Sequence, residues 1–182
     1  MKRAIFFDAP QIGDEEKASL MKAIDSGYVS SAGHWVGDFE KEFAEYLNVS
    51  EAVSTQNGTA ALHIALYELG IGAGDEVIVP VLTFVASVNP IRYVGAKPVF
   101  VDVDPKTWNI DAAKIEKSIT KKTKAILPVH LFGNPCDMGV IMKIARKYNL
   151  CVIEDAAEGL GATYHKKFVG TIEFFPEEGK YH

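Results

Sequence analysis

The stretch Glu76-Val77-Ile78-Val79-Pro80 decides the fold class, because its three central residues are all apolar. A second run, Cys151-Val152-Ile153, is also apolar at every position. A strand that is apolar on both faces is typical of the middle of a parallel sheet that helices cover on both sides. The sequence therefore predicts an α/β domain with a mostly parallel sheet and helices on both faces.

Working outward from these runs, strand-like and helix-like segments alternate along the chain. Strands are expected at 52–55, Glu76–Pro80, Lys97–Val101, 125–129 and 150–153. Helical patterns fill 58–69, 85–94, 111–119 and 137–148, and two earlier helices are expected at 14–26 and 37–47. The two earlier helices precede the first strand and are interpreted as an N-terminal helical arm over residues 1–50.

Composition excludes several classes of function. The 182 residues are 48% hydrophobic and 24% charged, with a net charge of −5. Without a long basic run we expect no nucleic-acid partner, and without a long apolar window we expect no membrane span. The chain shows no signal peptide, and Cys136 and Cys151 lack metal-ligand spacing, so a cytoplasmic protein with two reduced thiols is expected.

The first segment that indicates chemistry is Gln56-Asn57-Gly58-Thr59-Ala60, where a helix starts directly after an expected strand. Free N–H groups at a helix start, with a glycine that permits close approach, can hold a phosphate. A capped helix that holds nothing is the alternative. The spacing matches neither a P-loop nor a dinucleotide-binding fingerprint, so an unrelated nucleotide-binding module is disfavoured.

Two rings follow later strands. Phe84 lies just after the strand Glu76–Pro80, where it either stacks on a flat cofactor ring or belongs to the core. His130 follows the strand 125–129, where it either reaches the same crevice or is simply part of the structure. Because ligands of open α/β sheets bind at the carboxyl ends of strands, both positions are candidates.

Carboxylates follow the last apolar strand, at Glu154, Asp155 and Glu158. A buried carboxylate is costly without a cationic partner, and a protonated pyridine nitrogen would be one. A metal ligand or a structural hydrogen bond is the competing interpretation, although no cluster of His or Cys completes a metal site.

Taken in order, these segments resemble the DegT/StrS-type sugar aminotransferases, within which the chain is most similar to the GDP-perosamine synthase group. The resemblance covers about 8–171 and is carried by these motifs: Asn57-Gly58-Thr59-Ala60-Ala61-Leu62, Gly74-Asp75-Glu76-Val77-Ile78-Val79-Pro80, Thr83-Phe84-Val85-Ala86, Gly95-Ala96-Lys97-Pro98-Val99-Phe100-Val101-Asp102, Val129-His130-Leu131-Phe132-Gly133 and Ile153-Glu154-Asp155-Ala156-Ala157-Glu158.

The resemblance implies the large domain of an aspartate-aminotransferase-like enzyme that uses pyridoxal 5′-phosphate (PLP). Its phosphate would be held by the N–H groups of Gly58, Thr59 and Ala60. Phe84 would stack on the pyridine ring, Asp155 would pair with the ring nitrogen, and Glu158 would lie near the cofactor's hydroxyl group. Family members move an amino group from glutamate to a nucleotide-linked keto sugar, in active sites at a homodimer interface.

The chain departs from the family after Thr171, where the segment with the cofactor-binding lysine is expected. Neither Lys180 nor His182 has the matching neighbours. We therefore divide the chain into the arm, a partial PLP-binding domain at 51–171 and a divergent tail at 172–182. This truncated domain is expected to bind PLP weakly and to be inactive alone. The alternative is a non-catalytic partner that pairs with a full-length relative.

Overall fold

The computed structural model describes residues 10–172 and 174–176, which form two compact units that divide between Ser54 and Thr55. The first unit contains α1 (Asp14–Asp25) and α2 (Trp35–Leu47), which confirms the two helices expected there. Three acidic residues in the first turn of α1 stabilise that helix by interacting with the positive end of its dipole. Asn48 ends α2 in a left-handed conformation.

The strand expected at 52–55 is absent from the first unit. No strand among the described residues pairs with this segment. The backbone N–H and the hydroxyl of Ser54 instead both donate to Glu40 Oε1, at 2.8 Å each. Val53 is 78% exposed. The prediction was therefore wrong, because four residues of suitable composition do not make a strand without a partner to pair with.

The second unit is an α/β domain built on a parallel sheet. Its strands are β1 (Glu76–Pro80), β2 (Lys97–Val101), β3 (Thr123–Ile126) and β4 (Cys151–Val152), in the order β2-β1-β3-β4. All three pairings are parallel, and Val77 is paired with Pro98 of β2 on one side and with Ala125 of β3 on the other. The chain moves outward from β1 to β2 and then returns to the other side of β1, so the strand order reverses between β1 and β3.

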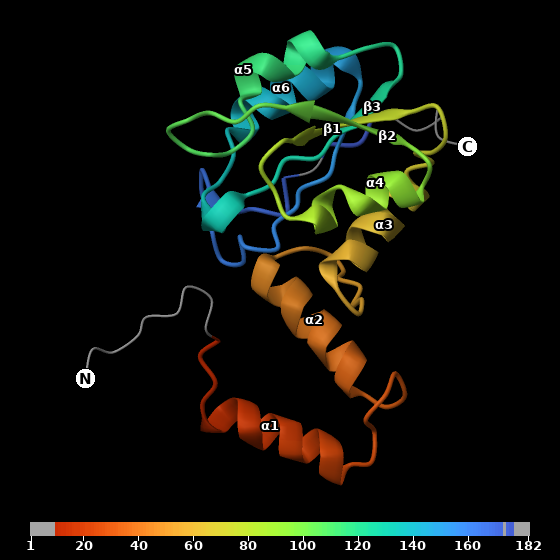
Figure 1. The fold of residues 1–182 in the computed structure, drawn as a ribbon. Coiled ribbons are helices and arrows are strands. Elements are labelled where there is room, and N and C mark those ends of the chain that lie inside the picture. Colours follow the sequence, from red (N-terminus) through yellow and green to blue (C-terminus); the bar gives the residue numbers. More distant parts are fainter. Residues whose placement is uncertain (1–9, 173, 177–182) are drawn as a thin grey trace, which may run out of the picture. The chain divides into compact units, whose positions relative to one another are not determined.

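Helices cover both faces of this sheet, as predicted. On one face lie α3 (Gly58–Glu68) and α4 (Asn89–Tyr93), and on the other lie α5 (Ala112–Ile115) and α6 (Met138–Tyr148) (Figure 1). Within β1, Val77 and Val79 pack in the cluster with α3 and α4, whereas Ile78 packs in the cluster with α5 and α6. The continuous apolar run thus serves two cores, and each buried aliphatic side chain contributes about 1.5–3 kcal/mol.

Some predicted helices are shorter or divided. The pattern at 85–94 forms a 3-10 turn, Val85–Ser87, and then α4, because Pro90 suits the first turn of a new helix but not a helix interior. The pattern at 111–119 forms α5 and a second 3-10 turn, Glu116–Ser118. The helix expected at 137–148 is confirmed, with Asp137 capping it through Val140 N–H.

The last part of the domain adds a hairpin and a bridge that the sequence did not predict. β5 (Thr163–Tyr164) and β6 (Lys167–Phe168) form an antiparallel pair, and Phe174 makes an antiparallel bridge to Val152 of β4. A third 3-10 turn, Leu131–Gly133, follows β3. Lys180 and His182 lie outside the described residues. Among the described helices, none is long and apolar enough to span a membrane.

Candidate functional site

A cavity of about 140 Å³ lies at the carboxyl ends of β1, β3 and β4. Its lining brings together Gly58 at the start of α3, Phe84 and Ser87 after β1, and Asp155 and Glu158 after β4. These strand ends flank the point where the strand order reverses, which is where open α/β sheets bind their ligands. Four of the six predicted site residues therefore share one cavity.

The start of α3 presents free backbone donors beside this cavity. The side chain of Asn57 caps the helix and accepts the Ala60 N–H at 2.9 Å, so that donor is engaged. The N–H groups of Gly58 and Thr59 have no partner among the described residues, as expected for the first turn of a helix. A Cβ added at Gly58 would meet nothing within 4 Å, so the space beside the helix start is open. Thr59 and Ala60 do not line the cavity themselves.

Phe84 lies at the rim of the cavity and not in the core. Phe84 is 74% exposed and lines the cavity. Its backbone is extended and leads directly into the turn Val85–Ser87. The alternative that Phe84 is a core residue is therefore wrong. An exposed ring at a cavity mouth leaves one face available for a flat ligand.

Asp155 is a buried carboxylate at the inner end of the cavity. The residue is 9% exposed, and it makes no ion pair within the part of the chain that the structure describes. Its Oδ2 accepts the hydroxyl of Ser87 at 2.6 Å, and its Oδ1 accepts the N–H of Ala157 at 3.2 Å. Buried charge without a counter-charge is unfavourable, so a cationic group in the cavity would be stabilised there.

Ser87 and Thr83 are two further residues of the site, and neither was predicted from the sequence. Ser87 is 1% exposed and lies between Asp155 and the hydroxyl of Thr83, which is 2.7 Å from its own hydroxyl. Both residues line the cavity. A spacing of four residues between two hydroxyl side chains was the available signal, but it becomes informative only once the fold brings Asp155 to the same turn.

Glu158 lines the cavity and also stabilises a neighbouring loop. Its Oε2 accepts the N–H of Phe132 at 2.5 Å. Phe132 has a left-handed backbone with φ of 54°, which is uncommon for a large side chain. The carboxylate thus holds this strained turn beside the cavity.

His130 does not line the cavity, so its proposed reach into the crevice is wrong. It is fully buried, and its Nε2 lies 2.8 Å from Oε2 of Glu154. Its Nδ1 accepts the N–H of Cys136, so Nε2 carries the ring proton and donates to Glu154. The second oxygen of Glu154 accepts the N–H of Ile172 at 2.6 Å. For Glu154 and His130, the structural alternative is correct.

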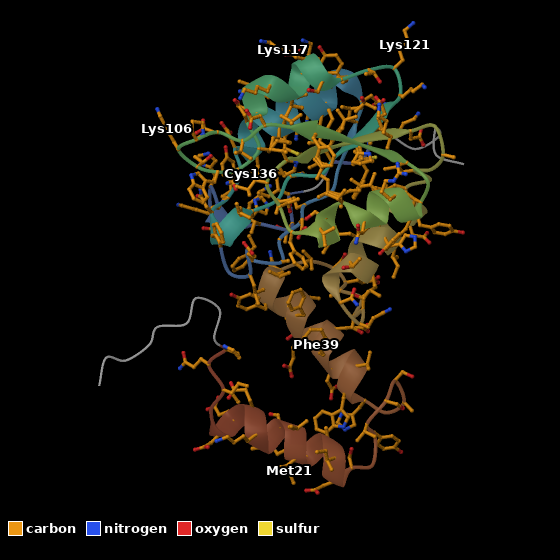
Figure 2. The ribbon with its side chains drawn as sticks, in the orientation of Figure 1. Met21, Phe39, Lys106, Lys117, Lys121 and Cys136 are labelled. Carbon is orange, nitrogen blue, oxygen red and sulfur yellow. The ribbon has the colours of Figure 1, made fainter. Side chains whose placement is uncertain are left out.

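No lysine is among the described residues that line the cavity. Lys106, Lys117 and Lys121 project from the surface of the domain (Figure 2). The described residues also contain no group of His, Cys, Asp or Glu suited to a metal ion. Both cysteines are buried and free, and burial raises the pKa of the Cys136 thiol to about 12.

Comparison with known proteins agrees with this geometry. The model of the DegT/DnrJ/EryC1/StrS aminotransferase family matches residues 10–176, which is nearly the whole chain. The chain belongs to this aminotransferase family. The resemblance inferred from the motifs is therefore confirmed, and pyridoxal phosphate is the cofactor of this family.

Individual members of the DegT/DnrJ/EryC1/StrS family show the same relation. The chain is 52% identical to GDP-perosamine synthase of Caulobacter vibrioides over 164 residues, which cover 90% of the chain and 44% of the relative. The solved structure of an aminotransferase from Psychrobacter cryohalolentis matches the chain with a TM-score of 0.88 and 45% sequence identity. The match covers 93% of this chain and 43% of the Psychrobacter chain.

A third relative is GDP-4-keto-6-deoxymannose-3-dehydratase, solved with a trapped PLP-glutamate geminal diamine. Its structure matches the chain with a TM-score of 0.84 and 30% sequence identity, over 91% of this chain and 44% of the dehydratase chain. The chain thus spans less than half the length of these relatives. The aminotransferase-like fold is confirmed for the part it spans.

Proposed function

We propose that the chain forms the cofactor-binding part of a PLP-dependent aminotransferase for nucleotide-linked keto sugars, with glutamate as the amino donor. The observation that carries this proposal is the shared cavity. A helix start with free N–H groups, an exposed aromatic ring and a buried carboxylate surround it at the carboxyl ends of the sheet.

These residues fit the cofactor in charge and in the kinds of group that they offer. PLP carries a phosphate, an aromatic ring and a ring nitrogen that can hold a proton. Asp155 is buried without an ion-pair partner in the described chain, so a protonated ring nitrogen would supply the missing positive charge. The open space at Gly58 leaves room for a phosphate beside the first turn of α3.

Each residue then has a distinct task. The N–H groups of Gly58, Thr59 and, after release from Asn57, Ala60 would bind the phosphate at the positive end of the helix dipole. Phe84 would cover one face of the ring and exclude water from it. Asp155 would hold the proton at the ring nitrogen. When bound, the cofactor supplies an electron sink for transfer of the amino group.

Glu158 would contribute at the opposite side of the ring. Its Oε1 is not used by the bond to Phe132, which engages Oε2. That free oxygen would accept a hydrogen bond from the cofactor's hydroxyl group.

The proposed substrates rest on the relatives. Names of similar proteins include a GDP-perosamine synthase and a dehydratase that acts on a GDP-linked keto sugar, and the latter was solved with glutamate joined to PLP. We therefore infer that this chain serves a nucleotide-sugar reaction with glutamate, in the cytoplasm. Two buried free thiols support a reducing compartment.

The chain alone would bind PLP weakly and would not catalyse amino transfer. No described residue that lines the cavity is a lysine, and a lysine is needed to bind the cofactor covalently and to move the proton between carbon centres. A homodimer or pairing with a full-length relative would then complete the site. The second role, as a non-catalytic partner, is favoured by the same observation that no described residue lining the cavity is a lysine.

Calorimetric titration with pyridoxamine 5′-phosphate (PMP), which needs no lysine, tests the cofactor site. The intact chain should bind PMP, and Asp155→Asn should bind it about tenfold or more weakly, because a hydrogen bond to a charged group contributes about 1.5–3 kcal/mol. Glu68→Gln, which removes an exposed charge outside the cavity, is the control. Absence of PMP binding to the unaltered chain would overturn the proposal.

The partner role has a separate test. The chain is mixed with a full-length GDP-perosamine synthase, and complex formation is followed by size-exclusion chromatography with light scattering. A mixed species supports pairing, whereas two unchanged peaks at micromolar concentration argue against it.

A further inference from the structure

Ser87 lies where the turn after β1 meets the carboxylate after β4. We propose that Ser87, supported by Thr83, is a positioning residue that fixes the Asp155 carboxylate toward the cofactor's ring nitrogen. This inference rests on the proposed function, because it concerns how the acid of that site is oriented.

The hydrogen bonds run in one direction. An ionised carboxylate only accepts hydrogen bonds, so the single hydroxyl proton of Ser87 points to Asp155 Oδ2, 2.6 Å away. The Ser87 oxygen is then left as the acceptor for the hydroxyl of Thr83 at 2.7 Å. Thr83 therefore donates to Ser87, and Ser87 donates to Asp155. In such a chain each hydrogen bond polarises and strengthens the next.

The remaining contacts of Asp155 complete the fixation. Its Oδ1 accepts the Ala157 N–H, while its backbone N–H donates to Pro128 O at 2.9 Å and its backbone oxygen accepts the His130 N–H at 3.1 Å. The backbone is thus held by the parallel bridge to Val129, which follows β3, and each carboxylate oxygen has one protein donor. A second acceptor direction on each oxygen stays available for a ligand.

The same turn also links the acid to the aromatic ring. The backbone N–H of Ser87 donates to the Phe84 carbonyl at 3.0 Å, which closes the turn that carries Phe84. One residue therefore joins two parts of the site through separate atoms: its backbone to the ring that covers the cofactor, and its side chain to the acid. Replacing the side chain alone should leave the position of Phe84 intact.

A pair of ligands separates this positioning role from general packing. The binding of PMP is compared with that of its analogue in which CH replaces the ring nitrogen, for the unaltered chain, Ser87→Ala and Thr83→Val. Ser118→Ala is the matched control: it removes a solvent-exposed hydrogen bond from the Ser118 hydroxyl to the Lys114 carbonyl, and neither residue lines the cavity. Ser87→Ala should weaken PMP binding about tenfold, Thr83→Val about threefold and the control not at all.

The dissociation constants of the analogue for the four proteins should agree within about twofold, because the analogue has no ring nitrogen for Asp155 to bind. If Ser87→Ala weakens both ligands equally, the positioning role is overturned. If the unaltered chain binds PMP and Asp155→Asn loses binding while Ser87→Ala does not, this inference fails and the proposed function stands. If the unaltered chain does not bind PMP, both fail.

A measurement without cofactor tests the hydrogen bond itself. A double-mutant cycle of Ser87→Ala and Asp155→Ala on the free energy of unfolding should give a non-additive coupling of the two sites, because each substitution alone removes the hydrogen bond between them. Additive effects would overturn the inference even if one variant folds poorly.

Discussion

The buried pair of His130 and Glu154 offers the sharpest prediction on stability. In Glu154→Gln, one of the two carboxylate oxygens becomes an NH₂ group. In the native domain both oxygens accept: one from His130 Nε2–H and the other from the N–H of Ile172. In either orientation of the amide, its NH₂ group therefore lies against one of these two N–H donors and cannot accept from it.

Changing the tautomer of His130 does not remove this conflict. If Nε2 gave up its proton to accept from the amide, Nδ1 would gain one and would face the N–H of Cys136 at 3.1 Å. Both side chains are at most 2% exposed, so water cannot replace the missing acceptor. Loss of a charge-assisted bond together with an unsatisfied buried donor costs about 2–5 kcal/mol.

Thermal unfolding followed by circular dichroism, with urea titration for the free energy, measures this cost. For a chain of this size about 2–4 °C of Tm corresponds to each kcal/mol, so a fall of about 4–20 °C is expected. Glu68→Gln removes the same charge from an exposed residue, the last of α3, and should change stability by less than about 0.5 kcal/mol. A Glu154→Gln variant as stable as this control would refute the reasoning.

Four further outcomes follow from the domain. Thr120→Val removes the hydrogen bond that most lowers the pKa of Glu76. A lowered carboxyl pKa stabilises the fold fully above the ordinary value of 4.5, and this stabilisation is lost as pH falls through the lowered pKa. The variant's loss of stability in urea titrations should therefore be present at neutral pH and shrink in strong acid. Ile126→Ala, at a fully buried position of β3, should lose about 2–5 kcal/mol in the same titrations, against about 0.5–1.5 kcal/mol for Ile126→Val. Cys136, buried and with a pKa raised to about 12, should react with a thiol reagent at pH 8 only after denaturation, and fast reaction of the native chain would contradict its burial. Lys166→Gly, at a φ of 68° in the hairpin turn, should raise the free energy of unfolding by about 0.5 kcal/mol, whereas a loss would count against the left-handed turn.

The parallel sheet could be predicted from sequence because its signal is local and strong. The run Val77-Ile78-Val79 serves two cores at once, and only a strand covered on both faces requires that pattern. The segment 52–55 shows the limit of such reasoning, because a strand depends on a partner that composition does not reveal. The hairpin at β5 and β6 was missed because His165 and Lys166 occupy its left-handed turn positions, where Asn and Gly are the usual signal.

The candidate site was predictable to the extent that its residues directly follow strands. Phe84 and Asp155 were found in this way, and the fold brings both to one cavity. His130 followed a strand as well, but its side chain turns inward to Glu154, and strand position alone does not fix side-chain direction. Ser87 was missed because its role depends on a contact with a residue 68 positions away.

The location of a bound cofactor tests the central claim most directly. A crystal structure of the chain with PMP should contain the phosphate at the N–H groups of Gly58 and Thr59, the ring against Phe84 and the ring nitrogen within about 3 Å of an Asp155 carboxylate oxygen. Electron density for PMP elsewhere on the domain, with this cavity empty, would contradict the account.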